Sequence, residues 1–329
     1  MRRSMQRLLR YTGVLASVGM FVVLVMGALV TSTKSGHGCS NTWPLCNGQV
    51  IPELSKLSVS HQLAALIEFS HRAATSVESV LVFALAAGTW LLYRQRREAR
   101  WLAPAMVVFL LLQAVLGAIA AGVHESPEVL ALHFGVSLIS FASIVLTTAF
   151  LFELRGGDVA RDRPIPARLG LLVWGSLIYT YVVVYMGAYV QHENAGTACG
   201  GWPLCNGGLL PVAGSAYQTY VNVAHRLAAG LLVLVILGLW LGARRARATR
   251  PDLYRGATAA LVSVLLQSVS GAYVSLSGVV LTSELLHAAL ISLLFASLAY
   301  LAYHLIPRRV CLPRPALAPT RQPSAVGAK

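Results

Sequence analysis

The sequence predicts an all-α membrane protein whose eight transmembrane helices form two four-helix bundles related by a pseudo-twofold axis. Three observations lead to this fold class. The chain of 329 residues is 56% hydrophobic and only 12% charged, with a mean hydropathy of +0.66, whereas a soluble domain is usually about a quarter charged. It contains eight long apolar stretches. Motifs of its first half recur in its second half in the same order.

Each apolar stretch is long enough to cross a bilayer, because a hydrocarbon core of ~30 Å needs ~20 helical residues. Helices are expected, since isolated strands would leave backbone groups unpaired in lipid. The first stretch is longer than a signal-peptide core and lacks a small-residue cleavage site, so we expect a retained helix. In chain order the stretches cover residues 11–31, 61–93, 102–122, 129–153, 169–190, 217–241, 256–277 and 284–306.

Basic residues are concentrated on one side of the expected helices. The net charge is +14, and arginines cluster before the first stretch, after the second, fourth and sixth, and in the tail. The opposite loops hold only Lys34 and Lys56. By the positive-inside rule, this asymmetry places both termini in the cytoplasm of a cell with a plasma or inner membrane. The charge is attributed to topology and to contacts with lipid head groups, so no nucleic-acid partner is expected.

The two halves of the chain carry matching motifs. A unit of four spans begins and ends on the same side, so the copies should be related by an axis along the membrane normal. We expect an N-terminal bundle over 1–153, a cytoplasmic linker over 154–168, a C-terminal bundle over 169–306 and a disordered tail over 307–329. The matched motifs are Met26–Ala28 with Met186–Ala188, Trp43–Gly48 with Trp202–Gly207, Leu111–Gln113 with Leu265–Gln267, and His71-Arg72 with His225-Arg226.

Four histidines lie in the second, fourth, sixth and eighth spans. His71 and His133 recur as His225 and His287, each 154 residues later, and all four are expected in the outer half of the membrane. Facing histidines in a helical bundle can supply an axial ligand pair for a haem iron. The alternative for each one is a polar residue that hydrogen-bonds at a helix interface. Iron–sulfur or zinc sites are less favoured, because the cysteines are in loops. Two haem sites are therefore predicted.

The surroundings of the histidines differ between the halves. Glu68 precedes His71 by three residues and shares its helix face, whereas Asn222 precedes His225. Glu68 should project toward the edge of a bound macrocycle, where it could transfer a proton or stabilise a developing cation. Alternatively, it pairs with Arg72 or with a haem propionate. We infer a reactive haem site in the N-terminal bundle and a permanent, electron-relaying haem in the C-terminal bundle.

Four of the five cysteines lie in two equivalent outer loops. Cys39 and Cys46 are in the first loop, and Cys199 and Cys205 are in the second. The outside of a cell is oxidising, so a disulfide within each loop is expected. Such a bridge is either a structural staple or a redox-active pair near the outer haem edge. Cys311, in the tail, is expected to be a free thiol.

Together these features resemble the haem A synthase family over residues ~11–306. They are the eight spans, the duplicated unit, the Glu-x-x-His motif and the loop cysteine pairs. The resemblance implies an oxidoreductase that oxidises a methyl group of haem O to a formyl group, giving haem A for terminal cytochrome oxidases. It also suggests haem O synthase and oxidase assembly factors as partners. By resemblance, His71 and His133 would carry the substrate haem, Glu68 would be the catalytic acid, His225 and His287 would ligate a resident haem b, Cys39–Cys46 would be redox-relevant, and Cys199–Cys205 would be structural.

Two other functions are compatible with the residues alone. A membrane di-haem b cytochrome that only transfers electrons would also need two histidine pairs. A membrane thiol–disulfide oxidoreductase would use the loop cysteines and could dispense with the histidines.

Overall fold

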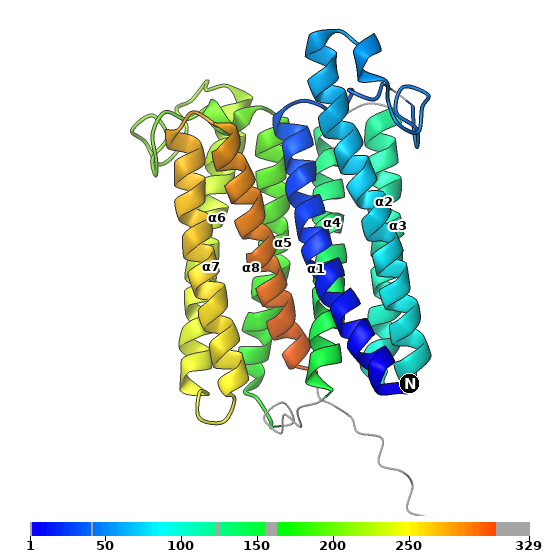
Figure 1. Cartoon of the computed structure of the whole chain (residues 1–329). Coiled ribbons are helices and arrows are strands. Elements are labelled where there is room, and N and C mark those ends of the chain that lie inside the picture. The colour runs from blue at the N-terminus through cyan, green and yellow to red at the C-terminus, as the bar shows by residue number, and fades with distance from the viewer. Residues whose placement is uncertain (1, 41, 123–125, 155–162, 307–329) are drawn as a thin grey trace, which may run out of the picture.

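The computed structural model describes the chain except for residues 1, 41, 123–125, 155–162 and 307–329 (Figure 1). Eight long helices make up most of this part, which confirms the all-helical prediction. The expected linker is described only in part, and the expected disordered tail, with Cys311, lies outside the described residues. The helices are α1 (Arg2–Ser32), α2 (Val59–Tyr93), α3 (Arg97–Gly122), α4 (Pro127–Glu153), α5 (Ala167–His192), α6 (Tyr217–Arg245), α7 (Pro251–Leu276) and α8 (Leu281–His304).

All eight helices are long and apolar enough to cross a membrane, so the chain is a multi-pass membrane protein. Their starts follow local chemistry. α4 begins with Pro127 in its first turn, and the Ser126 hydroxyl caps it by accepting a hydrogen bond from the backbone N–H of Val129 at 3.3 Å. α7 likewise begins with Pro251. α2 is the longest described helix at 35 residues, and its N-terminal end rises above the other helices (Figure 1).

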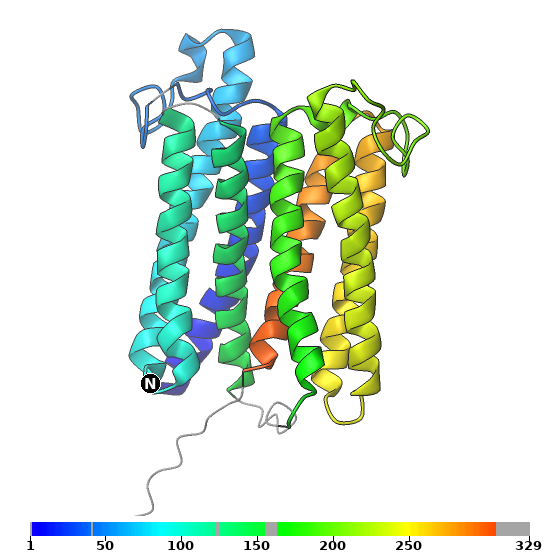
Figure 2. The ribbon, with the colours of Figure 1, turned by 180° about the vertical axis from the view of Figure 1, so that it is seen from behind.

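The helices pack in two groups of four. Within the first group, α1 and α3 each contact both α2 and α4, and within the second, α6 and α8 each contact both α5 and α7. The groups meet through α1 against α8 on one face and α4 against α5 on the other, with α4 also touching α8 (Figures 1 and 2). In its most apolar window α4 is 56% buried and α8 is 50% buried, against 22% for α6 and α7. α4 and α8 are therefore the central helices.

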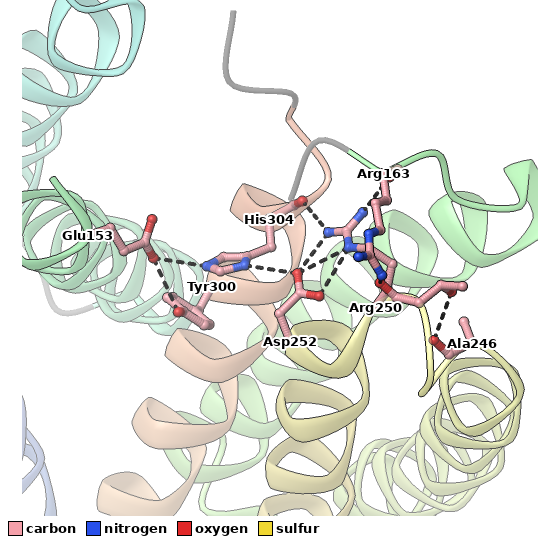
Figure 3. A network of polar contacts seen from close by, with 8 residues as sticks. Glu153, Arg163, Ala246, Arg250, Asp252, Tyr300 and His304 are labelled. Atoms are coloured by element: carbon pink, nitrogen blue, oxygen red, sulfur yellow. Dashed lines mark hydrogen bonds and ion pairs between the residues drawn. The ribbon is translucent and has the colours of Figure 1, made fainter. Parts of the chain in front are cut away.

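A network of charged side chains joins the two groups at the end of α8 (Figure 3). The two ring nitrogens of His304 lie 3.2 Å from Asp252 Oδ2 and 3.0 Å from Glu153 Oε1. The guanidinium of Arg250 lies 2.8 Å from the Asp252 carboxylate, and the Tyr300 hydroxyl donates to Glu153 Oε1 at 3.2 Å. His304 therefore contacts one carboxylate through each of its two ring nitrogens. The network ties α4 to α7 and α8.

Candidate haem sites

The four histidines lie in the N-terminal halves of four different helices, toward the end of the molecule that carries the two cysteine loops. His71 is on α2 and His133 on α4, in the first group, while His225 is on α6 and His287 on α8, in the second. Each pair thus lies within one four-helix group, with its members on opposite helices of that group. All four rings are half-buried and keep part of their surface accessible.

Each histidine ring packs against a glycine of a neighbouring helix. A Cβ atom would collide with the imidazole at Gly187, press tightly on it at Gly117 and Gly271, and reach ordinary van der Waals contact at Gly27. The glycines share the spacing of the internal repeat, and Gly27 and Gly187 lie in the repeated Met-Gly-Ala motif. From a Cβ built at each glycine, the distance to the ring Cε1 is 3.4 Å for Gly27 and His71, 3.2 Å for Gly117 and His133, 2.8 Å for Gly187 and His225, and 3.2 Å for Gly271 and His287.

The ring nitrogens keep unused binding capacity. The Nδ1 atoms of His71, His133 and His225 are buried without a hydrogen-bond partner among the described residues. In that same part of the chain, no group of three or more His, Cys, Asp or Glu side chains could hold a metal ion. A pair of imidazoles on facing helices suits an iron whose other positions are filled by a porphyrin. The residues present therefore fit two haems.

His287 differs from the other three because side chains of α7 contact its ring nitrogens. The Ser270 hydroxyl lies 2.8 Å from Nδ1 and itself donates to the carbonyl of Gln267. The Nδ1–H group can then donate to Ser270, which leaves Nε2 as the basic nitrogen. The Gln267 amide nitrogen lies 3.0 Å from that Nε2. Ligation of iron by His287 would require this amide to move aside.

The Glu68 carboxylate is held between the outer loop and its own helix. Its Oε2 accepts a hydrogen bond from the backbone N–H of Cys39 at 2.8 Å, and its Oε1 lies 2.5 Å from Arg72 Nη2. Arg72 also donates through Nη1 to the carbonyls of Thr42 and Leu45, each at 2.6 Å. The pairing with Arg72, one of the alternatives drawn from the sequence, is thus present. Glu68 connects the helix of His71 to the cysteine loop.

The second half repeats the arginine contacts without the carboxylate. Arg226 Nη1 donates to the carbonyls of Gly201 and Leu204 at 2.9 and 3.1 Å, and its Nη2 donates to the Ser275 hydroxyl. Asn222 stands where Glu68 stands in the first half, and its amide donates to the Ala195 carbonyl at 2.7 Å. A neutral amide replaces a charged carboxylate, so the chemical difference between the halves persists in three dimensions.

Both outer loops close through a disulfide. The sulfur atoms are 2.02 Å apart in Cys39–Cys46 and 2.05 Å apart in Cys199–Cys205. A tight turn follows the second cysteine of each loop. Asn47 and Gly48 have φ angles of 52° and 78°, and Asn206 and Gly207 have 52° and 81°. Two consecutive positive φ angles define the turn that Asn-Gly prefers. The repeated Trp-Pro-Leu-Cys-Asn-Gly motif therefore encodes this turn.

Residues 10–299 match the family described as cytochrome oxidase assembly protein (COX15-CtaA). The chain belongs to this family. Relatives named heme A synthase include one from Exiguobacterium sp., 39% identical over 300 residues, which cover 91% of this chain and 94% of the relative. One from Bacillus licheniformis is 41% identical over 298 residues (90% and 95%), and one from Bacillus cereus is 40% identical over 297 residues (90% and 93%).

The family match includes every site residue predicted from the sequence. The four histidines, Glu68 and both cysteine pairs lie within residues 10–299. The match leaves out the first residues of α1 and the residues from 300 onward, which include the end of α8. The inner network around His304 is therefore partly beyond the matched region.

Sequence reasoning missed one buried acid, Glu78. It lies on α2, is only 3% exposed, and neither carboxylate oxygen has a hydrogen-bond partner among the described residues. A Cβ atom built at Gly19 of α1 would lie closest to Oε2 of this carboxylate. The signal was available, since a charged residue inside an apolar span is rare and usually functional. Glu78 also follows His71 by seven residues, which puts both on one face of α2.

Proposed function

We propose that this chain is a haem A synthase, an oxidoreductase that converts a methyl group of haem O into the formyl group of haem A for terminal cytochrome oxidases. The observation that carries the proposal is an asymmetry. Two pairs of interior histidines occupy equivalent helices, but only the first pair has Glu68 on the same helix face, with Asn222 in the equivalent place. Relatives about 40% identical over nine-tenths of the chain carry the name heme A synthase.

In this proposal the N-terminal bundle, residues 1–153, holds the substrate. His71 and His133 would ligate the iron of haem O, which supplies the redox chemistry when bound. Glu68 is the catalytic acid: its carboxyl group holds or releases a proton beside the substrate while the reacting methyl group becomes polar. Arg72 and the Cys39 N–H fix the position of that carboxylate. Fixed donors and acceptors reduce the reorganisation that the reaction requires.

The C-terminal bundle, residues 169–306, would hold a resident haem b through His225 and His287. The Ser270 hydroxyl would hold the His287 ring through Nδ1 and leave Nε2 to bind iron once the Gln267 amide moves aside. No carboxylate stands at the position of Glu68, so this site suits a haem that passes electrons and is not itself modified. The residues from 154 to 168 connect the two bundles.

The Cys39–Cys46 disulfide is proposed to take part in the redox cycle. The Cys39 backbone N–H donates a hydrogen bond to Glu68. Opening or closing the disulfide would therefore alter the position of the Glu68 carboxylate. In the second loop, Asn222 bonds to Ala195 and Gly196. Cys199–Cys205 is accordingly assigned a structural role.

The proposed setting is the plasma or inner membrane, with both termini in the cytoplasm. The uneven distribution of arginine between the loops supports this orientation. The histidines, Glu68 and the disulfides then face the outer side. Haem O is the substrate, haem O synthase and oxidase assembly factors are the proposed partners, and lipid surrounds the helices.

Identification of the bound pigments tests the proposal. Haem extracted from the purified protein should be haem b together with haem O or haem A, as judged by mass. Two equivalents of haem b alone would support an electron-transfer cytochrome. A protein without haem absorbance that still exchanges disulfides would support a thiol–disulfide oxidoreductase. Either result would overturn the proposal.

A further inference from the structure

Glu78 belongs to a layer of buried side chains about two helical turns inward from the first histidine pair. Seven residues of α-helix span about 10 Å, so Glu78 lies about that far from His71 along α2. Ser140 follows His133 by the same seven residues on α4. Gln113 of α3 lies 3.5 Å from the Ser140 hydroxyl and 3.9 Å from Met20 Sδ on α1. All four side chains of this layer are at most 8% exposed.

The equivalent layer of the second group is less polar. Leu232 occupies the position of Glu78, and Leu294 occupies that of Ser140, each 154 residues later; both are buried. Gln267, the counterpart of Gln113, is engaged with His287. Among the described residues, the second group therefore has leucine at both positions where the first group has Glu78 and Ser140.

Glu78 packs against Gly19, and in the second half of the chain both positions carry different residues. A Cβ at Gly19 would lie only 2.1 Å from Glu78 Oε2, so the carboxyl group sits directly on the α1 backbone. In the register of the Met-Gly-Ala repeat, the counterpart of Gly19 is Tyr179, whose hydroxyl donates to the Ala228 carbonyl. One half thus combines glycine with glutamate, and the other combines tyrosine with leucine. The absence of a side chain at Gly19 therefore leaves room for the Glu78 carboxyl group.

Burying the Glu78 carboxyl group without a hydrogen-bond partner destabilises the protein. Burying an ionised carboxylate without a counter-charge costs far more than burying the neutral acid, so Glu78 is expected to be neutral. A neutral carboxylic acid can both donate and accept a hydrogen bond, which is what a hydroxyl group requires. The cost is recovered only when a polar ligand group reaches it.

We propose that Glu78 recognises the hydroxyl group on the substrate haem and so makes the N-terminal site specific for a hydroxyalkylated haem. This inference rests on the proposed function. Haem O differs from protohaem in carrying a hydroxylated farnesyl chain in place of a vinyl group. The distance from His71 to Glu78 is comparable with the reach from a porphyrin iron to its peripheral groups. A site built to pair with a hydroxyl discriminates against an analogue that lacks it, because its own polar group is then left unpaired.

The test measures haem binding by absorbance in protein purified with its resident haem. Wild-type protein, Glu78→Gln and Glu78→Leu are titrated with haem O, with protohaem, and with haematohaem, in which hydroxyethyl groups replace the vinyl groups of protohaem. Comparing the last two isolates the hydroxyl from the farnesyl tail. Wild type should prefer haematohaem over protohaem by at least about tenfold. Glu78→Leu, which copies Leu232, should lose this preference, while Glu78→Gln should keep most of it.

An infrared measurement gives an independent readout. The carbonyl band of a protonated carboxylic acid should be absent in Glu78→Gln and should shift in wild type on binding haematohaem but not protohaem. Equal preference in wild type and Glu78→Leu, with no band shift, would overturn the role of Glu78. His71→Ala separates this failure from that of the proposed function. If added haem binds equally well to His71→Ala, then the assignment of the N-terminal site is itself wrong.

Discussion

The backbone amide of Cys39 donates a hydrogen bond to the carboxylate of Glu68 at 2.8 Å, across 29 positions of sequence. One member of the outer disulfide is thereby fixed to the helix that carries His71. Arg72 completes the arrangement by pairing with Glu68 and holding two carbonyls of the same loop. The loop and the proposed acid therefore form one structural unit, which substitutions of Glu68, Arg72 and Cys39 probe.

Replacing Glu68 with glutamine should lower the rate of haem O conversion about 100-fold or more, because an amide cannot hold and release the proton. Resident haem per folded protein should be unchanged, because Arg72 keeps its bonds to two loop carbonyls and the second helix group is not altered. Haem A and haem O extracted from cells are compared by mass. Conversion equal to wild type would remove Glu68 from the mechanism.

Removing either arginine should destabilise the protein, and Arg72→Leu should do so more than its matched control Arg226→Leu. Loss of Arg72 leaves the 5%-exposed Glu68 side chain without its counter-charge, which costs about 3–5 kcal/mol for a buried pair. Loss of Arg226 removes only hydrogen bonds to neutral groups. Thermal unfolding in detergent measures both, and equal losses would contradict this account.

Gly187→Val should eliminate the resident haem, because the new side chain would occupy the place of the His225 ring. Gly175→Val on the same helix is the matched control, since a Cβ there meets nothing within 4 Å. Haem content per protein is measured from the reduced pyridine complex. Retention of haem b in Gly187→Val would show that the ring does not need this contact to bind iron.

The two disulfides should differ in their effects. Cys39→Ser should lower haem O conversion, because the loop no longer fixes the amide that binds Glu68. Cys199→Ser should lower stability by about 2–4 kcal/mol and leave conversion per folded protein intact. Conversion assays normalised to haem b content distinguish these outcomes. If both variants lose conversion equally, the proposed division of roles is incorrect.

The inner network should contribute to the contact between the two helix groups. His304→Leu would remove the ring that bridges the carboxylates of Glu153 and Asp252 but leave Arg250 paired with Asp252, and we expect a loss of about 1–3 kcal/mol. Because the network is at the opposite end from the histidine pairs, the haem spectrum of the folded protein should not change. Thermal unfolding and absorbance spectra check the two parts of this prediction.

The fold class follows from the sequence because hydropathy and helix length are local properties. Eight apolar stretches predict eight helices, and every helix except α6 starts before its apolar stretch, α1 by nine residues and α3 and α7 by five. The sequence also identifies the four histidines as equivalent positions, since a fixed offset of 154 residues relates them. The bond from Cys39 to Glu68 could not be predicted, because no periodicity relates a loop amide to a helix side chain. The central position of α4 and α8 could not be predicted either, because all eight spans are similarly apolar.

The sequence by itself determined the number of spans, their expected orientation, the duplicated unit and the residue types of the two sites. These depend on composition and spacing, which the chain carries in one dimension. Only the tertiary structure decided which groups meet: Glu68 with Cys39 and Arg72, each histidine with its glycine, and Glu78 with Gly19. The reason is physical. Whether a buried polar group is satisfied or left without a partner depends on how neighbouring helices pack, and that packing brings together residues far apart in the chain.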